Sequence, residues 1–170
     1  MLSLSRVSHR ARIAVALVLF IAVAACKKDP AAAEAEAVKA ATQATGAALK
    51  KFGTDFARLE GEIEPLRTAN PAQAATRIRA DIVPMLDAIA TGLDTAAAAE
   101  ERYVAVATGD EQAIAGIRKN IAVHRRQAGA FADLRDGYGK EADLLTKGPL
   151  TIDDKREIGK ARLAAAQRTQ

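Results

Sequence analysis

Apolar residues recur along the chain at helical spacing in four stretches, separated by short polar segments that contain proline or glycine. The first stretch covers about 30–64, where the repeat alternates between four and three residues for about four heptads. That period places the apolar side chains on one face of an α-helix. The repeat consists of Val38, Thr42, Thr45, Leu49, Phe52, Phe56, Leu59, Ile63 and Leu66.

Prolines mark both ends of this first helix. Asp29 precedes Pro30, and an aspartate N-cap followed by proline in the first turn is a frequent helix start. Pro65 lacks the N–H that a helix needs and restricts the residue before it. We therefore expect the helix to end near Glu64.

The second stretch predicts a helix over about 71–107, opened by Asn70 as N-cap and Pro71 in the first turn. Pro84 lies inside the apolar repeat, which predicts a kink in the helix rather than its end. Gly92 leaves open whether the helix breaks in its second half. The apolar face consists of Ile78, Ile82, Met85, Ile89 and Leu93.

The remaining stretches predict a third helix over about 110–146 and a short fourth over about 151–168. The segment 108–111, "TGDE", has the composition of a capping box at the start of the third helix. Gly137 and Gly139 leave open whether that helix breaks near its end. The fourth helix has a thin apolar face, formed by Ile158, Ala161, Leu163 and Ala165.

These elements predict an all-α protein: an antiparallel, up-down bundle of three long helices and a short fourth. The predicted loops of about two to six residues are too short to join long helices in any other arrangement. Alanine, the best helix former, is the commonest residue after position 26, and a single cysteine excludes an internal disulfide. We expect residues 31–170 to form one bundle domain.

The first 25 residues have the organisation of a secretory signal peptide. A short basic segment precedes the thirteen apolar residues from Ile13 to Ala25. A membrane-spanning helix needs about 20 such residues, whereas about 7 to 15 suit the core of a signal peptide. The sequence therefore predicts export, with residues 1–25 removed and residues 26–30 left as a short tether.

The segment Val23-Ala24-Ala25-Cys26 resembles the lipobox of bacterial lipoproteins, in which an aliphatic residue and two small residues precede a cysteine. The resemblance implies cleavage between Ala25 and Cys26 and attachment of lipid to the Cys26 sulfur. The acyl chains, palmitate among them, would anchor the protein to a membrane of the cell envelope. Lys27 in place of aspartate favours the periplasmic face of the outer membrane over the inner membrane.

Most of the excess positive charge lies in the leader, which holds Arg6, Arg10 and Arg12 and no acidic residue. The rest of the chain is close to neutral, which argues against a nucleic-acid partner. Four basic residues recur at seven-residue spacing in the third helix: Arg118, Lys119, Arg125 and Arg126. They could contact an anionic surface such as lipid head groups, but flanking of an apolar seam is the favoured interpretation.

Few residues suit catalysis or metal binding. His124 is the only histidine after the leader, and it falls on the apolar face at the edge of the predicted core without further ligands at helical spacing. Glu60, Glu62 and Glu64 match no calcium-loop pattern, so we expect a solvated charge cluster. The three serines all lie in the leader, and no catalytic motif is present. The sequence predicts no metal site, no cofactor and no enzymatic activity.

The functional hypothesis from the sequence is a lipid-anchored envelope protein whose helical domain serves binding, scaffolding or assembly. A periplasmic helical chaperone or stress protein is the alternative, and it would require exposed apolar grooves. A metal-binding protein or an enzyme is a weaker third hypothesis. The expected partners are the membrane, through Cys26, and an envelope protein that the sequence does not identify. Self-association stays open.

Overall fold

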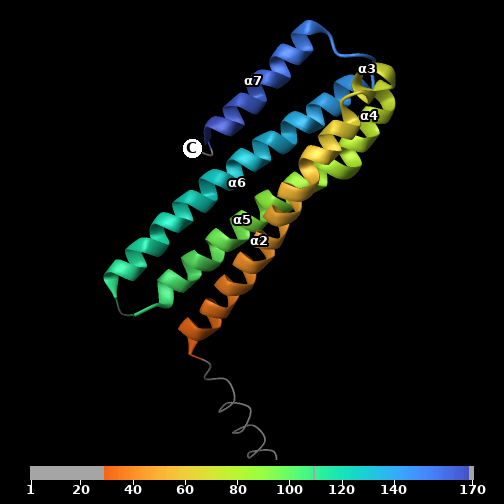
Figure 1. Ribbon diagram of the computed structural model, residues 1–170. Helices are drawn as coiled ribbons and strands as arrows, with labels where there is room; N and C mark the ends of the chain where they lie inside the picture. The colour runs from red at the N-terminus through yellow and green to blue at the C-terminus, as the bar shows by residue number, and fades with distance from the viewer. Residues whose placement is uncertain (1–28, 109, 169–170) are drawn as a thin grey trace, which may run out of the picture.

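The computed structural model describes residues 29–108 and 110–168, and every element in this part of the chain is helical (Figure 1). Three long helices run antiparallel side by side, and a shorter last helix lies along the third (Figure 1). The all-α, up-down bundle is confirmed. The elements are α2 (Pro30–Ile63), α3 (Leu66–Ala69), α4 (Pro71–Arg77), the π-helical turn η1 (Ile78–Ile82), α5 (Val83–Val106), α6 (Glu111–Leu145) and α7 (Ile152–Arg168).

Side chains cap α2 and α4 where the sequence predicts. The carboxylate of Asp29 accepts a hydrogen bond from the N–H of Ala31 at 3.0 Å, which opens α2. The side chain of Asn70 caps α4 in the same way, by accepting from the N–H of Gln73 at 3.2 Å. The cap of α6 differs from the predicted capping box, because Asp110 and not Thr108 is the N-cap: it accepts from the N–H of Gln112 at 2.8 Å. Each cap supplies an acceptor to an N–H group that has no partner within its own helix.

The helix around Pro84 continues, and the distortion there takes the form of a π-helical turn. Residues Ile78–Ile82 form η1, and the N–H of Val83 reaches back five residues to the carbonyl of Ile78. Proline lacks an N–H and its ring crowds the carbonyl four residues earlier, so a wider turn before Pro84 relieves that contact. Gly92 lies within continuous α5, and the helix α6 continues through Gly137.

The hydrophobic core is concentrated in the half of the bundle that contains α3 and α4. Phe52 and Phe56 of α2 face Phe131 and Tyr138 of α6, and each of these two cross-helix pairs is edge-to-face. The largest fully buried apolar side chains are Ile63, Ile78, Ile82, Leu86, Ile89, Leu93 and Leu145. Toward the other end of the bundle, the buried residues of α5 are mostly small, among them Ala96, Ala97 and Ala99.

The apolar repeat of α2 predicts burial wrongly at two positions, Thr42 and Leu49, which are exposed. Leu49 lies on the predicted face yet remains 38% exposed, whereas Thr45 is buried at 5%. The cause is that α2 crosses α5 closely near Thr45, where a small residue fits and a leucine does not.

Only part of the predicted apolar face of α7 packs against the bundle. Ile158 and Ala165 are buried, whereas Leu163 is 60% exposed and Ala161 is also exposed. Because α7 packs mainly against α6, one narrow strip of it is covered.

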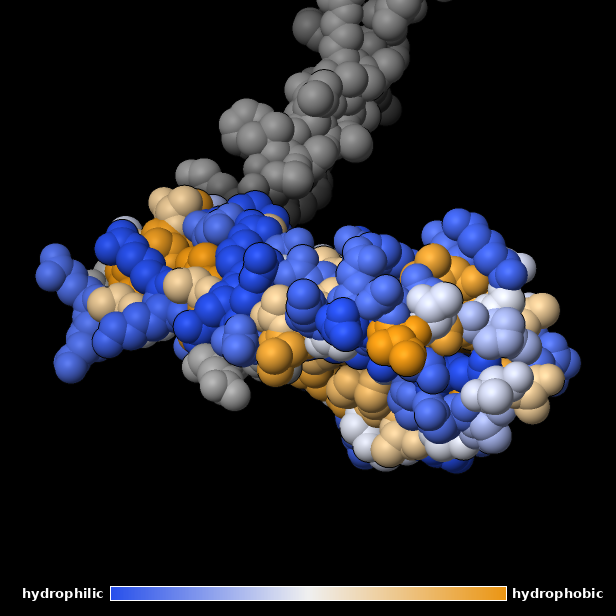
Figure 2. Space-filling model, turned by 90° about the horizontal axis from the view of Figure 1, so that it is seen from above, coloured by the Kyte–Doolittle hydropathy of each residue, from blue (hydrophilic) through white to orange (hydrophobic). Residues whose placement is uncertain are grey.

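One helix of the described residues, Pro71–Val106, is long and apolar enough to cross a membrane by length and composition. Half of its most apolar stretch is buried inside the bundle, as expected for a helix packed between α2 and α6. The face seen in Figure 2 shows small hydrophobic areas separated by hydrophilic ones.

Candidate functional site

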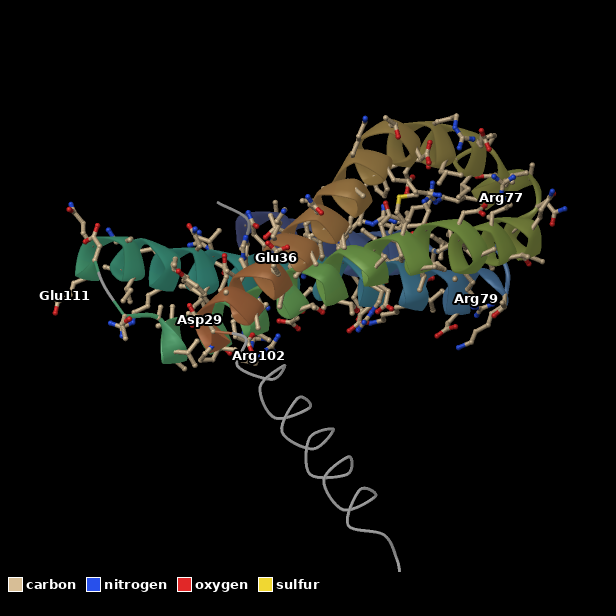
Figure 3. The ribbon with its side chains drawn as sticks, turned by 90° about the horizontal axis from the view of Figure 1, so that it is seen from below. Asp29, Glu36, Arg77, Arg79, Arg102 and Glu111 are labelled. Carbon is tan, nitrogen blue, oxygen red and sulfur yellow. The ribbon has the colours of Figure 1, made fainter. Side chains whose placement is uncertain are left out.

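The two ends of the bundle differ in chemistry. Asp29 and Arg102 lie close together at the end where α6 begins, with Glu111 nearby, and Arg77 and Arg79 lie at the opposite end (Figure 3). An ion pair of 3.0 Å joins Arg102 of α5 to Glu34 of α2. The start of α2, the end of α5 and the start of α6 therefore form one end, and any tether before Asp29 leaves the bundle there. Ala25 and Cys26 lie outside the described residues.

The four basic residues of α6 occupy neighbouring surface positions, but they are not equivalent. Arg118, Lys119 and Arg126 are exposed. Arg125 instead binds Asp94 at 2.8 Å and Glu101 at 3.1 Å on α5. The hydrogen bonds that Arg125 donates to these carboxylates raise its pKa. All four residues of the predicted basic strip are thus exposed, but the charge of Arg125 is compensated by carboxylates of α5, and this residue joins α5 to α6.

A groove of about 470 Å³ lies between α2 and the segment η1–α5. Its lining is mostly apolar and comes from both sides: Ala48, Leu59, Ala80, Pro84, Met85 and Ala88. Charged residues complete the lining, Lys51, Asp55 and Arg58 from α2 and Asp81 from η1. We call this feature the α2–α5 groove. It combines apolar contact area with charges of both signs.

Most of the charged residues of the α2–α5 groove are held by ion pairs. Arg58 binds Glu62 at 2.6 Å, and the Nε of Arg77 binds Asp81 at 2.6 Å. Among the described residues, Lys51 takes part in no ion pair. Its ammonium group is therefore the charge in the groove most readily available to a ligand.

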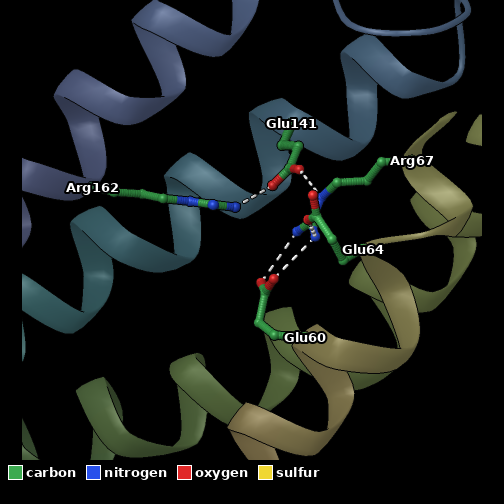
Figure 4. A network of polar contacts seen from close by, with 5 residues as sticks. All are labelled: Glu60, Glu64, Arg67, Glu141 and Arg162. Carbon is green, nitrogen blue, oxygen red and sulfur yellow. Dashed lines mark hydrogen bonds and ion pairs between the residues drawn. The ribbon is translucent and has the colours of Figure 1, made fainter.

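A second feature is a buried network of ionised side chains where α2, α3, α6 and α7 meet (Figure 4). Arg67, only 11% exposed, donates to three carboxylates. Its Nε lies 2.6 Å from Glu141, and its Nη1 lies 3.0 Å from Glu60 and 2.6 Å from Glu64. A guanidinium has donors on several edges, so one arginine can hold three elements of the fold together.

Arg162 extends this network to α7. It binds the second carboxylate oxygen of Glu141, whose side chain is 2% exposed, and its guanidinium carbon lies 4.0 Å from the centre of the Tyr138 ring. The Nε of Arg162 is buried without a hydrogen-bond partner. The cation–π contact with Tyr138 and the ion pair with Glu141 therefore hold this arginine of α7 against α6.

Three groups at the network, Glu60, Arg67 and Tyr138, have shifted pKa values. Burial alone would raise the pKa of Glu60, but hydrogen bonds from Arg67 and Tyr138 and the charges of Arg67 and Arg162 lower it overall. Burial alone would lower the pKa of Arg67, but Glu60 and Glu141 raise it. Burial and the neighbouring Glu60 raise the pKa of Tyr138. All three shifts lead away from neutrality, which suits a structural role better than proton transfer.

The expectation of a solvated acidic cluster is wrong for Glu60. Its side chain is 23% exposed and bound to Arg67, and Glu62 is bound by Arg58 and Arg77. Sequence reasoning also missed Glu141. The available signal was its position on the apolar face of α6, three residues after Tyr138 and four before Leu145, where a charged residue requires a buried partner.

His124 lies at the core edge, as predicted, with 24% of its side chain exposed. The unpredicted feature is its partner: Nδ1 of His124 lies 3.0 Å from a carboxylate oxygen of Glu100, whose side chain is 8% exposed. A cavity of about 140 Å³ adjoins Glu100. Within residues 29–108 and 110–168, no group of three or more histidine, cysteine, aspartate or glutamate side chains is placed to hold a metal ion.

No family model matches the chain, and comparison with curated proteins and with solved structures also returns no match.

Proposed function

We propose that this chain is a lipid-anchored protein of the bacterial cell envelope, whose helical bundle binds a partner and catalyses no reaction. The observation that supports a lipid anchor on Cys26 is the position of α2. This helix begins at Pro30, four residues after Cys26 of the lipobox-like segment. Four residues reach at most about 14 Å. Lipid on Cys26 would therefore hold the Asp29 end of the bundle next to the membrane, with the α3–α4 end pointing away.

The α2–α5 groove supports the binding role. A site of about 470 Å³ with apolar walls and a few charged groups is within the range of ligand-binding clefts in proteins. Its charges would orient a partner segment that carries opposite charges at matching positions. The partner we propose is another envelope protein, bound through a short amphipathic segment.

A chaperone or stress protein is the alternative function. A general chaperone needs a broad apolar surface that accepts many unfolded chains. Four of the ten residues that line the α2–α5 groove are charged, and the hydrophobic areas in Figure 2 are small and separated. These features favour a selective partner over unfolded clients. Suppression of the aggregation of unrelated unfolded proteins by the purified domain would reverse that preference.

The anchor is tested by replacing Cys26 with serine in cells fed radioactive palmitate. We expect the wild-type protein to carry label and to sediment with membranes, and the C26S protein to do neither. Lys28→Ser, outside the lipobox-like segment, is the matched control and should behave as wild type. Label and membrane retention that survive in C26S would refute the anchor.

The groove is tested by photo-crosslinking in the envelope. A benzophenone amino acid replaces Ala88, an exposed residue of the α2–α5 groove, or Ala122, an exposed residue of α6 outside it. We expect one discrete adduct from position 88 and none of the same mass from position 122. Reversal of charge in Lys51→Glu should reduce the adduct at position 88. Equal adducts from both positions would contradict a specific groove.

A further inference from the structure

Glu100 is a buried carboxylate with an incomplete set of partners. Its side chain is 8% exposed, and Nδ1 of His124 meets only one of its two oxygens, Oε2. No hydrogen bond to Oε1 occurs among the described residues. A carboxylate can accept about four hydrogen bonds, and Oε1 is not among the buried unpartnered atoms of the described residues, so it is open to a further donor.

The cavity beside Glu100 supplies the space for a missing partner. It is a pocket of about 140 Å³ that opens to the surface, similar in volume to the closed cavity of roughly 150 Å³ that binds benzene in an engineered protein. Its walls come from three helices: Ala35 and Val38 of α2, Tyr103 of α5 and Ile117 of α6. Glu100 is the one charged residue in the lining.

The chemistry of the lining favours a cation. The carboxylate of Glu100 attracts a positively charged group and repels an anion. The ring of Tyr103 in the lining is a further group that attracts cations.

We infer that the cavity beside Glu100 binds a small organic cation, an alkylammonium group with a short apolar tail. The ammonium would donate hydrogen bonds to Oε1 of Glu100, and the tail would cover Val38 and Ile117. A metal ion would not use the apolar walls, and an anion would meet the like charge of Glu100. The binding site goes beyond the proposed partner groove, which lies elsewhere on α2.

The test is a nuclear magnetic resonance titration of the intact chain in a non-ionic detergent with butylammonium chloride. A ligand of five heavy atoms should bind with a Kd in the millimolar range and shift the resonances of Glu100, His124 and Ile117. The neutral isostere 1-butanol should bind at least about tenfold more weakly, because its hydroxyl can still donate to Glu100 but lacks the positive charge that strengthens the hydrogen bond. Equal binding of the amine and the alcohol would overturn the proposal.

Matched variants locate the site. Glu100→Gln should weaken butylammonium binding about tenfold to a hundredfold, whereas Glu101→Gln, one residue away and exposed, should not. Ala35→Leu should block the cavity while it leaves Glu100 intact, with exposed Ala33→Leu as its control. This second pair decides the question even if E100Q fails to fold, because Ala35 is exposed. Undiminished binding in A35L would refute the site.

An experiment with lipid vesicles identifies the source of the cation. Vesicles that contain phosphatidylethanolamine present the same ammonium on a lipid head group, whereas vesicles of phosphatidylglycerol alone do not. Shifts at Glu100 with the first vesicles, lost in A35L, would assign the site to lipid. Shifts with butylammonium but with neither vesicle would assign it to a free amine. No shift with any of these probes would overturn the inference.

Discussion

Gly92 of α5 lies directly against Thr45 of α2, and a Cβ atom at position 92 would stand 3.0 Å from the Thr45 hydroxyl oxygen. That hydroxyl donates a hydrogen bond of 2.8 Å to the carbonyl of Ala41, so it cannot turn away freely. The glycine therefore permits the close crossing of α2 over α5. This contact explains why a helix-weakening residue stands in the middle of an unbroken helix.

Gly92→Ala should consequently fail to give the usual stabilisation of an alanine in a helix. At Gly116, where a Cβ would meet nothing within 4 Å, the same change should raise the free energy of unfolding by about 0.5–1 kcal/mol. At Gly92 the crowding of Thr45 should cancel or reverse that gain. Urea unfolding of G92A, G116A and the double variant G92A/T45A measures this. Recovery of the gain in the double variant is expected, and equal gains at positions 92 and 116 would contradict the contact.

Removal of the Glu141 charge should destabilise the bundle strongly. Glu141 is 2% exposed and binds both Arg67 and Arg162, so Glu141→Gln leaves two arginines short of a counter-charge. Loss of one partner from a buried ion pair costs about 3 kcal/mol or more. Glu64→Gln is the control: it removes another partner of Arg67, but one 75% exposed, and should cost less than about 1 kcal/mol. Urea unfolding measures both, and similar small losses would mean that the network contributes little.

The helices and their caps follow from local rules, whereas the buried network does not. Asp29 and Asn70 act within two or three residues of their own position, so the sequence alone identifies them, and for α6 it places the cap within two residues of Asp110. Arg67 and Glu141 are 74 positions apart and meet only because two helix pairs fold back on each other. The sequence shows that Glu141 interrupts an apolar face, but it does not show which arginine forms an ion pair with it.

The apolar repeat also predicts burial less well than it predicts helix. A repeat of 3.5 residues drifts around a straight helix of 3.6 residues per turn. Which members are covered then depends on where a neighbour crosses. Leu49 lies exposed because α5 approaches α2 most closely one turn earlier, at Thr45. The candidate groove and the Glu100 cavity depend on the same crossings, so neither is visible in the sequence.

Acid should weaken the fold through Glu60. Its pKa in the folded protein lies below the ordinary value of 4.5, because the hydrogen bonds and charges of the network outweigh burial. The deprotonated form thus stabilises the fold above about pH 4.5, and that contribution is lost as the pH falls through the lowered pKa. Unfolding by urea at about pH 7 and pH 3 measures the loss. It should be smaller in Glu60→Gln and unchanged in the exposed control Glu36→Gln.

The exposed basic residues of α6 provide the last prediction. If the strip contacts an anionic surface, the segment 27–170, which lacks Cys26, should bind vesicles rich in phosphatidylglycerol, and salt should weaken that binding. Each basic residue near such a surface contributes about 1 kcal/mol, so replacing Arg118, Lys119 and Arg126 together with glutamine should weaken binding at least about tenfold.

Arg125→Gln is the matched control for that triple variant. Arg125 is bound to Asp94 and Glu101, so its charge is already compensated within the bundle, and its removal should leave vesicle binding nearly unchanged. It should instead weaken the contact between α5 and α6 and lower the free energy of unfolding. The loss should be less than about 1 kcal/mol because the ion pairs are exposed. Vesicle co-sedimentation separates the two effects. Binding that falls equally in R125Q and in the triple variant would mean that net charge, not the exposed strip, attracts the protein to the surface.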